Sequence, residues 1–300
     1  MKKTIKLAIL VFVLLVSSAF LLLLVGSFIL YHDIADEEEI KLTYWQSIKA
    51  IATQNAEGDR EIQLKESRLQ ENHKHISIYY EQDFSDLMPI AKETLDLAME
   101  KTEVLFGRTS PEPIDLLVFQ DGEELAEFAE IEGVGGIYSD FDKVLAIHYH
   151  NKDLILKRDQ LGLSMFQEVV LHEYAHYAFA HKASSEDAYP YWFIEGVAEY
   201  AGDVGQGAVL PTFELISFNQ LTTYEHWHET RYTVGTDNYA QSHYAINFLI
   251  DKYGEKAVSK IMDSVNETKD FEQSLQSITG LTLDEFESAF VTSYEKIKLK

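Results

Sequence analysis

The segment VVLHEYAHYAFAHK contains two histidines and a glutamate whose spacing suits metal-dependent hydrolysis. His172 and His176 are four residues apart, so on a helix they lie one turn apart on the same face. Two imidazoles placed in this way can occupy adjacent corners of a tetrahedral Zn²⁺ site. Glu173 would then lie beside the open coordination position, where a carboxylate can act as a general base. The spacing therefore predicts a zinc site equipped for hydrolysis.

A third ligand is expected from the later stretch WFIEGVAEY. Eighteen residues separate His176 from Glu195, which is enough for a polar turn over residues 182–191 and a second helix beginning near Pro190. Catalytic zinc sites use three protein ligands and one open position, and two histidines with a glutamate form a known set. Glu199, one turn after Glu195, could accept the second ring N–H of a zinc-bound histidine, or could be an exposed helix carboxylate.

The elements that would position these residues follow an α+β pattern. Apolar periodicity predicts strands at 75–81 and 114–120, helices at 85–106, 122–129 and 165–183, and a hairpin over 135–151 with its second strand at 143–150. Nearly all residues after 163 are expected to be helical. Residues 31–75 are charge-rich and poor in apolar residues, which indicates a stalk with some helix.

The N-terminal residues predict a membrane anchor. Lys2, Lys3 and Lys6 precede an uncharged apolar run over residues 7–30, long enough for a helix to cross a hydrocarbon core of ~30 Å. A cleaved signal peptide has a shorter apolar run and a small-x-small cleavage site, so an uncleaved anchor is favoured. With acidic residues after the run, at 33–39, the positive-inside rule predicts a cytoplasmic N-terminus and an extracytoplasmic domain in a single-pass cell-membrane protein.

Composition excludes several functional classes. The chain has 50 acidic and 25 basic residues and a net charge of −25, spread along its length, which argues against a nucleic-acid partner. It has no cysteine, so disulfides, thiolate ligands and a cysteine nucleophile are excluded, and any metal site must use His, Asp or Glu. Three hundred residues suit one large domain or two modest lobes.

The motifs HEYAH and WFIEGVAEY resemble those of the gluzincins, the peptidase MA clan of zinc metallopeptidases. The 18-residue gap and the Trp-x-x-Glu-Gly-x-Ala pattern are similar to the aminopeptidase M1-type members, and the resemblance to bacterial membrane-anchored or secreted peptidase MA-like proteins covers residues 76–294. It implies one zinc ion bound by His172, His176 and Glu195, Glu173 as general base, and peptide or protein substrates. The Gly-x-Met-Glu-Asn segment with which aminopeptidases hold the substrate amine is absent from the sequence.

The resemblance also implies a fold and a domain organisation. The fold expected is α+β, with a zincin-like N-terminal lobe, made of a small mixed sheet and the active-site helix, and a C-terminal all-helical lobe that provides the third ligand. Four parts follow: a membrane anchor at 1–30, a stalk at 31–75, the α+β lobe at 76–183 and the helical lobe at 184–300.

The oxyanion formed during peptide hydrolysis needs a hydrogen-bond donor besides zinc. In the family, a tyrosine or histidine of the helical lobe is that donor. Tyr239 matches the tyrosine of the M1 pattern Tyr-x-x-Gly, with Ser242 in place of the glycine. Tyr244 and His243 are alternative donors, and an ordinary buried tyrosine at 239 is an equally open interpretation.

Two further expectations concern residues 143–150. His148 and His150 alternate on this strand and face one side, where they could form a second metal pair or line a surface or cleft. In peptidases of this clan the substrate lies extended along a sheet edge beside the active-site helix. The strand at 143–150 directly precedes that helix and follows three glycines, so it is expected to be the edge.

The sequence therefore predicts a membrane-anchored, extracytoplasmic zinc metallopeptidase with Glu173 as general base. The alternative is a catalytically silent zinc-containing scaffold or peptide-binding protein of the same fold. An intact Glu173 favours the enzyme, because a scaffold has no need of a general base.

Overall fold

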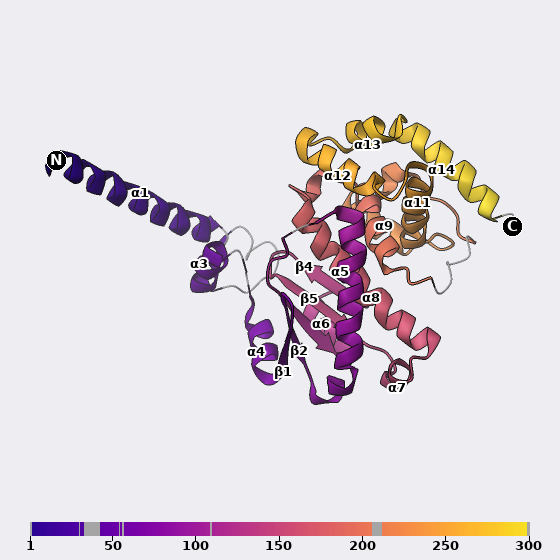
Figure 1. Ribbon diagram of the computed structural model, residues 1–300, viewed down its shortest axis with the longest axis horizontal. Helices are drawn as coiled ribbons and strands as arrows, with labels where there is room; N and C mark the ends of the chain where they lie inside the picture. The colour runs from indigo at the N-terminus through magenta and orange to yellow at the C-terminus, as the bar shows by residue number, and fades with distance from the viewer. Residues whose placement is uncertain are drawn as a thin grey trace. The chain divides into compact units, whose positions relative to one another are not determined.

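The computed structural model describes most of the chain. The described residues are 2–29, 31–32, 43–53, 55, 57–108, 110–205 and 212–298. The chain divides into two compact units. The first is Met1–Arg68 with Ser139–Val144, and the second is Leu69–Tyr138 with Leu145–Lys300. Figure 1 traces both from the N-terminus in indigo to the C-terminus in yellow.

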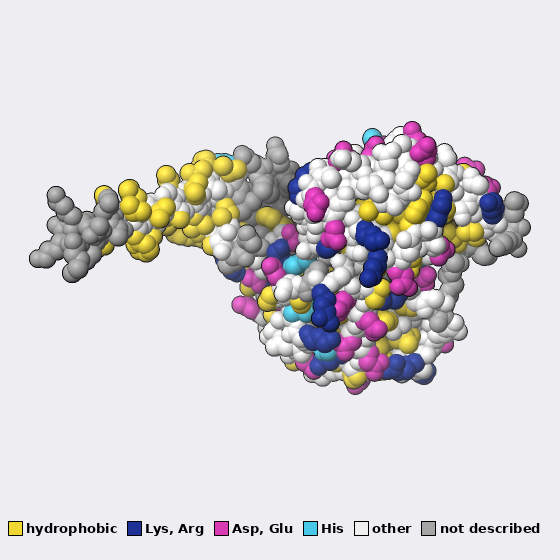
Figure 2. Space-filling model, turned by 45° about the horizontal axis from the view of Figure 1, so that its top comes forward, with side chains coloured by type: hydrophobic (Ala, Val, Ile, Leu, Met, Phe, Trp, Pro, Cys, Tyr) yellow, Lys and Arg dark blue, Asp and Glu magenta, His cyan; other side chains and the backbone are white. Residues whose placement is uncertain are grey.

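The first unit begins with an apolar helix, α1 (Lys2–Ile29). Its segment Ile9–Ile29 has a mean hydropathy of 3.0 and is long and apolar enough to cross a membrane, a test that a signal sequence also passes. Hydrophobic side chains cover its described surface (Figure 2). The predicted apolar helix is thus confirmed, whereas the acidic residues at 33–39 that bear on its orientation lie outside the described residues.

Two short helices follow in the first unit, α3 (Tyr44–Thr53) and α4 (Asp59–Ser67). On α4, Lys65 pairs with Glu61 and with Glu57, the latter at 2.9 Å. Burial raises the pKa of Glu61 to about 7, although the ammonium of Lys65 opposes this shift. The segment expected to be a stalk therefore contains these two helices, and its residues 69–73 form a strand of the sheet.

The second unit is built on a five-stranded mixed sheet in the order β1-β2-β3-β5-β4. Its strands are β1 (Leu69–His73), β2 (Ile76–Tyr80), β3 (Ile114–Phe119), β4 (Gly136–Ser139) and β5 (Val144–His148). β1 is antiparallel to β2, and β2 is parallel to β3. The backbone N–H of residue 148 donates to the carbonyl of residue 135, and that of residue 149 to the carbonyl of 119. β5 is therefore antiparallel to β4 and parallel to β3.

The strand order corrects the expected position of the sheet edge. β5 lies between β3 and β4, so the strand at 143–150 is not an exposed edge. Its residues 144–147 are all buried, as is usual for a strand covered on both faces. The edge strand on this side of the sheet is β4, whose four residues are half-buried. The uninterrupted apolar run VLAI, where a half-exposed strand would alternate, is the sequence signal for this placement.

Helices make up the rest of the second unit. They are α5 (Met88–Phe106), α6 (Gly122–Ala129), α7 (Lys152–Leu156), α8 (Gln160–Lys182), α9 (Tyr191–Gly202), α10 (Tyr224–Arg231), α11 (Asn238–Tyr253), α12 (Ala257–Thr268), α13 (Phe271–Thr279) and α14 (Leu283–Lys298), with short 3₁₀ helices η2 (Gln82–Leu87), η3 (Glu186–Ala188) and η4 (Phe218–Leu221). The strands lie together in the lower part of this unit and α11–α14 in its upper part (Figure 1).

A continuous set of buried apolar side chains runs through this unit from Ile76 in β2 to Tyr294 in α14. The predicted α+β class and the hairpin of β4 and β5 are confirmed. The helix expected at 122–129 has those bounds in α6, and the helix expected at 165–183 begins five residues earlier, at Gln160 in α8. The polar strand β1 was not expected, because nothing in its composition, LQENH, is typical of a strand.

Candidate metal centre

Three closely packed helices, α8, α9 and α11, position the candidate metal ligands. The N-cap of α8 is Asp159, whose carboxylate accepts hydrogen bonds from two backbone N–H groups in the first turn. The chain reverses after α8, and Pro190 precedes α9. At Gly196, next to Glu195, a Cβ would lie only 2.6 Å from the carbonyl oxygen of Ser242 in α11. The glycine of the motif Glu-Gly thus lets α9 lie directly against α11.

His172 and His176 of α8 and Glu195 of α9 point their donor atoms at one another. The two imidazole Nε2 atoms are 3.0 Å apart, and Glu195 Oε2 lies 3.5 and 3.6 Å from them. Ligands of a tetrahedral zinc ion with bonds of about 2.0–2.2 Å are separated by roughly 3.4 Å. Glu195 Oε2 is buried and accepts no hydrogen bond from any described residue. A cation would satisfy this oxygen, so the three residues could hold a metal ion.

The charges of the cluster are strongly coupled. Burial by itself raises the pKa of the Glu195 carboxyl, but the two imidazoles outweigh burial and hold the pKa below its usual range. Burial by itself lowers the pKa of the His172 imidazole, but the carboxylates of Glu195 and Glu199 raise it well above its ordinary value. A metal ion that binds here therefore competes with a proton on His172.

Glu199 lies where the spacing predicts. Its Oε1 is 3.1 Å from Nδ1 of His172, the ring nitrogen that faces away from the other two donors. A carboxylate in this position accepts the Nδ1–H and leaves Nε2 free to bind a metal. Glu199 can thus set both the tautomer and the ring orientation of His172.

Glu173 is buried on α8 beneath the edge strand β4. A Cβ on Gly136 would lie 2.6 Å from Cγ of Glu173 and 2.8 Å from its Oε1, so this strand passes directly over the carboxyl group. Burial raises the pKa of Glu173, while the imidazoles of His172 and His176 oppose the shift. A raised pKa suits a carboxylate that must accept and later release a proton near neutral pH.

Tyr239, at the start of α11, also lies near the cluster. Its ring packs edge-on against Trp227 with 5.1 Å between ring centroids, and the guanidinium carbon of Arg231 is 5.7 Å from its centroid. Burial and the carboxylate of Glu195 raise the pKa of Tyr239 to about 12, although Arg231 opposes them. The hydroxyl therefore keeps its proton at neutral pH and can donate a hydrogen bond.

Comparisons with known proteins place the chain in a family. It is 31% identical over 245 residues to the "Uncharacterized protein YhcO" of Bacillus subtilis, and the matched region covers 80% of this chain and 76% of YhcO. The chain belongs to the YhcO family. No protein-family model matches it. The name of this relative assigns no activity.

The two other candidate donors of this YhcO-family chain have different surroundings. His243 Nε2 lies 2.7 Å from the side-chain nitrogen of Asn247 and 3.6 Å from Asp203. Tyr244 packs against the ring of Phe213 and is buried. Burial and the carboxylate of Asp203 raise the pKa of Tyr244, whereas burial and the carboxylate of Glu195 raise that of Tyr239. Of the two tyrosines, Tyr239 is therefore the one whose pKa the Glu195 carboxylate affects, and it stays the first candidate for the oxyanion donor.

His148 and His150 face each other at the end of β5, as their alternation predicts. Their Nε2 atoms are 2.8 Å apart, and Nδ1 of His148 is 3.2 Å from the carbonyl of Gly135. Among the described residues, no third ligand completes a metal site with them. We therefore interpret them as a hydrogen-bonded pair.

Tyr191 is a site residue that the sequence analysis missed. It opens α9 one turn before Glu195, on the same face, and its ring packs against Tyr224 and Trp227 at 5.5 Å from each. Burial, followed by the charge of Glu195, raises its pKa. The four-residue spacing to Glu195 is the signal that could have identified it.

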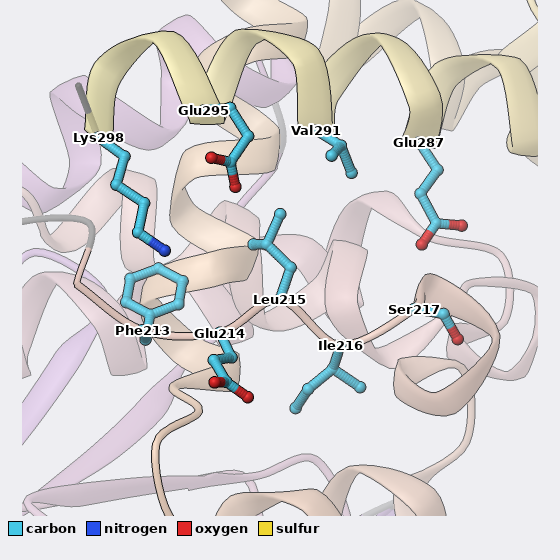
Figure 3. A pocket seen from close by; sticks show the side chains of 9 residues that line it. All are labelled: Phe213, Glu214, Leu215, Ile216, Ser217, Glu287, Val291, Glu295 and Lys298. Atoms are coloured by element: carbon cyan, nitrogen blue, oxygen red, sulfur yellow. The ribbon is translucent and has the colours of Figure 1, made fainter.

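The chain also contains a hollow of about 350 Å³ away from these ligands. The extended segment 213–217 lines it on one side and α14 on the other (Figure 3). Glu287, on its α14 side, accepts a hydrogen bond from the backbone N–H of Phe218 at 3.0 Å. None of the candidate metal ligands lines this hollow, so it has no evident part in metal chemistry.

Gly136→Ala is expected to displace the Glu173 carboxyl or the edge strand, because the new methyl group has no room. We expect a loss of about 1–3 kcal/mol in the free energy of unfolding, typical of an overpacked site, with metal binding retained. Chemical denaturation and metal analysis of the purified full-length protein would measure both. Gly58→Ala is the matched control, since a Cβ at Gly58 meets nothing within 4 Å. Equal stability of the Gly136 and Gly58 variants would contradict the close contact.

Proposed function

We propose that this protein is a membrane-anchored zinc metallopeptidase that hydrolyses peptide bonds. The main support for this proposal is the cluster of His172, His176 and Glu195. In this cluster a buried carboxylate oxygen without a hydrogen-bond partner faces two imidazole nitrogens. Glu173, buried one residue after the first of these histidines, adds the base that hydrolysis needs.

The donor set favours zinc over other common metal ions. Two imidazoles with one carboxylate is an established set for catalytic Zn²⁺. Mg²⁺ and Ca²⁺ prefer six or more oxygen ligands, which this nitrogen-rich cluster does not offer. The spacing of 3.0–3.6 Å between the three donor atoms also fits the edges of a zinc tetrahedron.

The chain's own groups have separate roles in the proposed reaction. When bound, zinc polarises a peptide carbonyl and makes water a stronger nucleophile at neutral pH. The Glu173 carboxylate takes a proton from the attacking water and passes it to the leaving amine as the C–N bond breaks. The Tyr239 hydroxyl donates a hydrogen bond to the carbonyl oxygen as its negative charge develops. Glu199 keeps His172 in the tautomer that binds metal through Nε2.

We assign the second unit a zincin-like arrangement, with the sheet and α8 in one lobe and the helices from residue 184 onward in the other. An extended substrate would pair with the edge strand β4, which passes over Glu173. In this proposal α1 is an uncleaved anchor with a cytoplasmic N-terminus, so that the peptidase acts outside the cytoplasm.

Metal removal tests the proposal. We expect the detergent-solubilised full-length protein to cleave members of a random peptide library, to lose this activity on chelation, and to regain it with one equivalent of Zn²⁺. Mass spectrometry of the peptides would detect the cleavage. Cleavage that persists after complete metal removal would contradict the zinc mechanism, and zinc binding without any cleavage would indicate a silent scaffold.

A further inference from the structure

Arg231, at the end of α10, lies beside Tyr239, the candidate oxyanion donor. Its guanidinium carbon lies 5.7 Å from the ring centroids of both Tyr232 and Tyr239. Its Nη2 is 3.5 Å from the carbonyl oxygen of Gly133, which is the outer limit of hydrogen bonding. A guanidinium has five N–H donors, so these contacts use little of its hydrogen-bonding capacity.

The surroundings of Arg231 are unusual for so acidic a chain. Arg108 pairs with Glu103 at 2.9 Å, and Arg158 pairs with Glu93 at 2.6 Å. Arg231 forms no ion pair with any acidic side chain in the described ranges, although the sequence has 50 acidic residues. Its half-buried side chain instead contacts two tyrosine rings and one carbonyl, none of which carries a negative charge. An arginine without an acidic side-chain partner is expected where the anion is supplied by a ligand.

Arg231 lies between helix α11 and the segment that leads into strand β4. On the helical side it faces Tyr239. The Tyr239 ring, 5.7 Å from the guanidinium carbon, packs against Trp227. Trp227 in turn packs against Tyr191, which lies one turn before Glu195 on α9. On the strand side it reaches Gly133, three residues before Gly136, where an added Cβ would lie 2.6 Å from Cγ of Glu173. A peptide lying beside β4 would therefore meet the guanidinium.

We infer that Arg231 binds a carboxylate of the substrate, so that the enzyme prefers peptides with a carboxylate near the scissile bond. This inference rests on the proposed peptidase function. A guanidinium matches a carboxylate with two parallel hydrogen bonds, which an ammonium cannot reproduce. The net charge of −25 repels anionic peptides at long range, so the preference has to come from this local contact.

The carboxylate can belong to the free C-terminus or to an Asp or Glu side chain. Three random peptide libraries distinguish these sources. The first has free C-termini but no Asp or Glu, the second has amidated C-termini with Asp and Glu, and the third has amidated C-termini without either. Each is digested by zinc-loaded full-length protein, by Arg231→Gln and Arg231→Lys, and by the control Arg108→Gln, whose arginine is exposed and ion-paired.

We expect kcat/KM for one of the carboxylate libraries to exceed that of the neutral library by about 10- to 100-fold, the usual size of a charge-assisted contact. This ratio should fall to about 1 in Arg231→Gln, keep part of its value in Arg231→Lys and be unchanged in Arg108→Gln. A ratio of about 1 in the wild-type protein, or a ratio that survives Arg231→Gln, would overturn the inference.

Binding without turnover separates this inference from the proposed function. Fluorescently labelled members of the three libraries are titrated with zinc-loaded Glu173→Gln and with the double variant Glu173→Gln, Arg231→Gln. Tighter binding of carboxylate peptides to the first protein alone supports the role of Arg231 even if wild-type protein cleaves nothing. Equal binding of all three libraries by both proteins overturns that role even if the wild-type protein is an active peptidase.

Discussion

Glu173→Gln is expected to lower kcat/KM for peptide hydrolysis by about 10²- to 10⁴-fold while the protein keeps its zinc. The amide has the same size as the carboxyl group, so it fits under β4, where Gly136 leaves room for it. It cannot accept the proton of the attacking water, and that is the only function the substitution removes. Steady-state kinetics and metal analysis of the same preparation measure both quantities.

Glu272→Gln is the matched control, because Glu272 is an exposed glutamate in the first turn of α13. We expect it to retain wild-type activity. A Glu173→Gln protein with one zinc ion and activity within a few-fold of wild type would show that another group is the base.

His172→Ala and His176→Ala are each expected to lose most of the bound zinc. Three protein ligands leave no spare donor, so the loss in affinity should exceed the 10- to 100-fold typical of removing an outer partner such as Glu199. Elemental analysis of the purified full-length variants measures the metal content. Zinc should also raise the thermal midpoint of the wild-type protein and not of these variants, because a ligand stabilises only the state that binds it.

His226→Ala is the control for the ligand variants. His226 is exposed on α10, and its replacement should leave one zinc ion per chain. Stoichiometric zinc in both the His172 and the His176 variant would exclude this cluster as the zinc site.

The parts of the fold that depend on local periodicity could be predicted from the sequence. α6 was predicted with its observed bounds and α9 with its start near Pro190, whereas the start of α8 was placed five residues too late because its N-cap, Asp159, was overlooked. β1 could not be predicted, because its polar residues form a strand only through pairing with β2. The interior place of β5 was also missed, although its unbroken apolar run was a signal for it.

Local spacing predicts some residues of the candidate site, and others come together only through packing between distant segments. His172 and His176 share one helix, so their spacing alone places them together. Glu195 reaches them only because α9 packs closely on α8; a Cβ at Gly202 of α9 would lie 3.2 Å from the carbonyl oxygen of Glu168 in α8. Arg231 comes near the site through a contact with a residue 98 positions earlier, and no local pattern encodes such a contact.

The most direct measurement is a parallel digest of one random peptide library by zinc-loaded wild-type protein and by zinc-loaded Glu173→Gln, with new peptide termini identified by mass spectrometry. We expect many new termini with the wild-type protein and almost none with the variant. Equal cleavage by the two proteins, or no cleavage by a wild-type protein that holds one zinc ion, would contradict a zinc peptidase that uses Glu173 as its base.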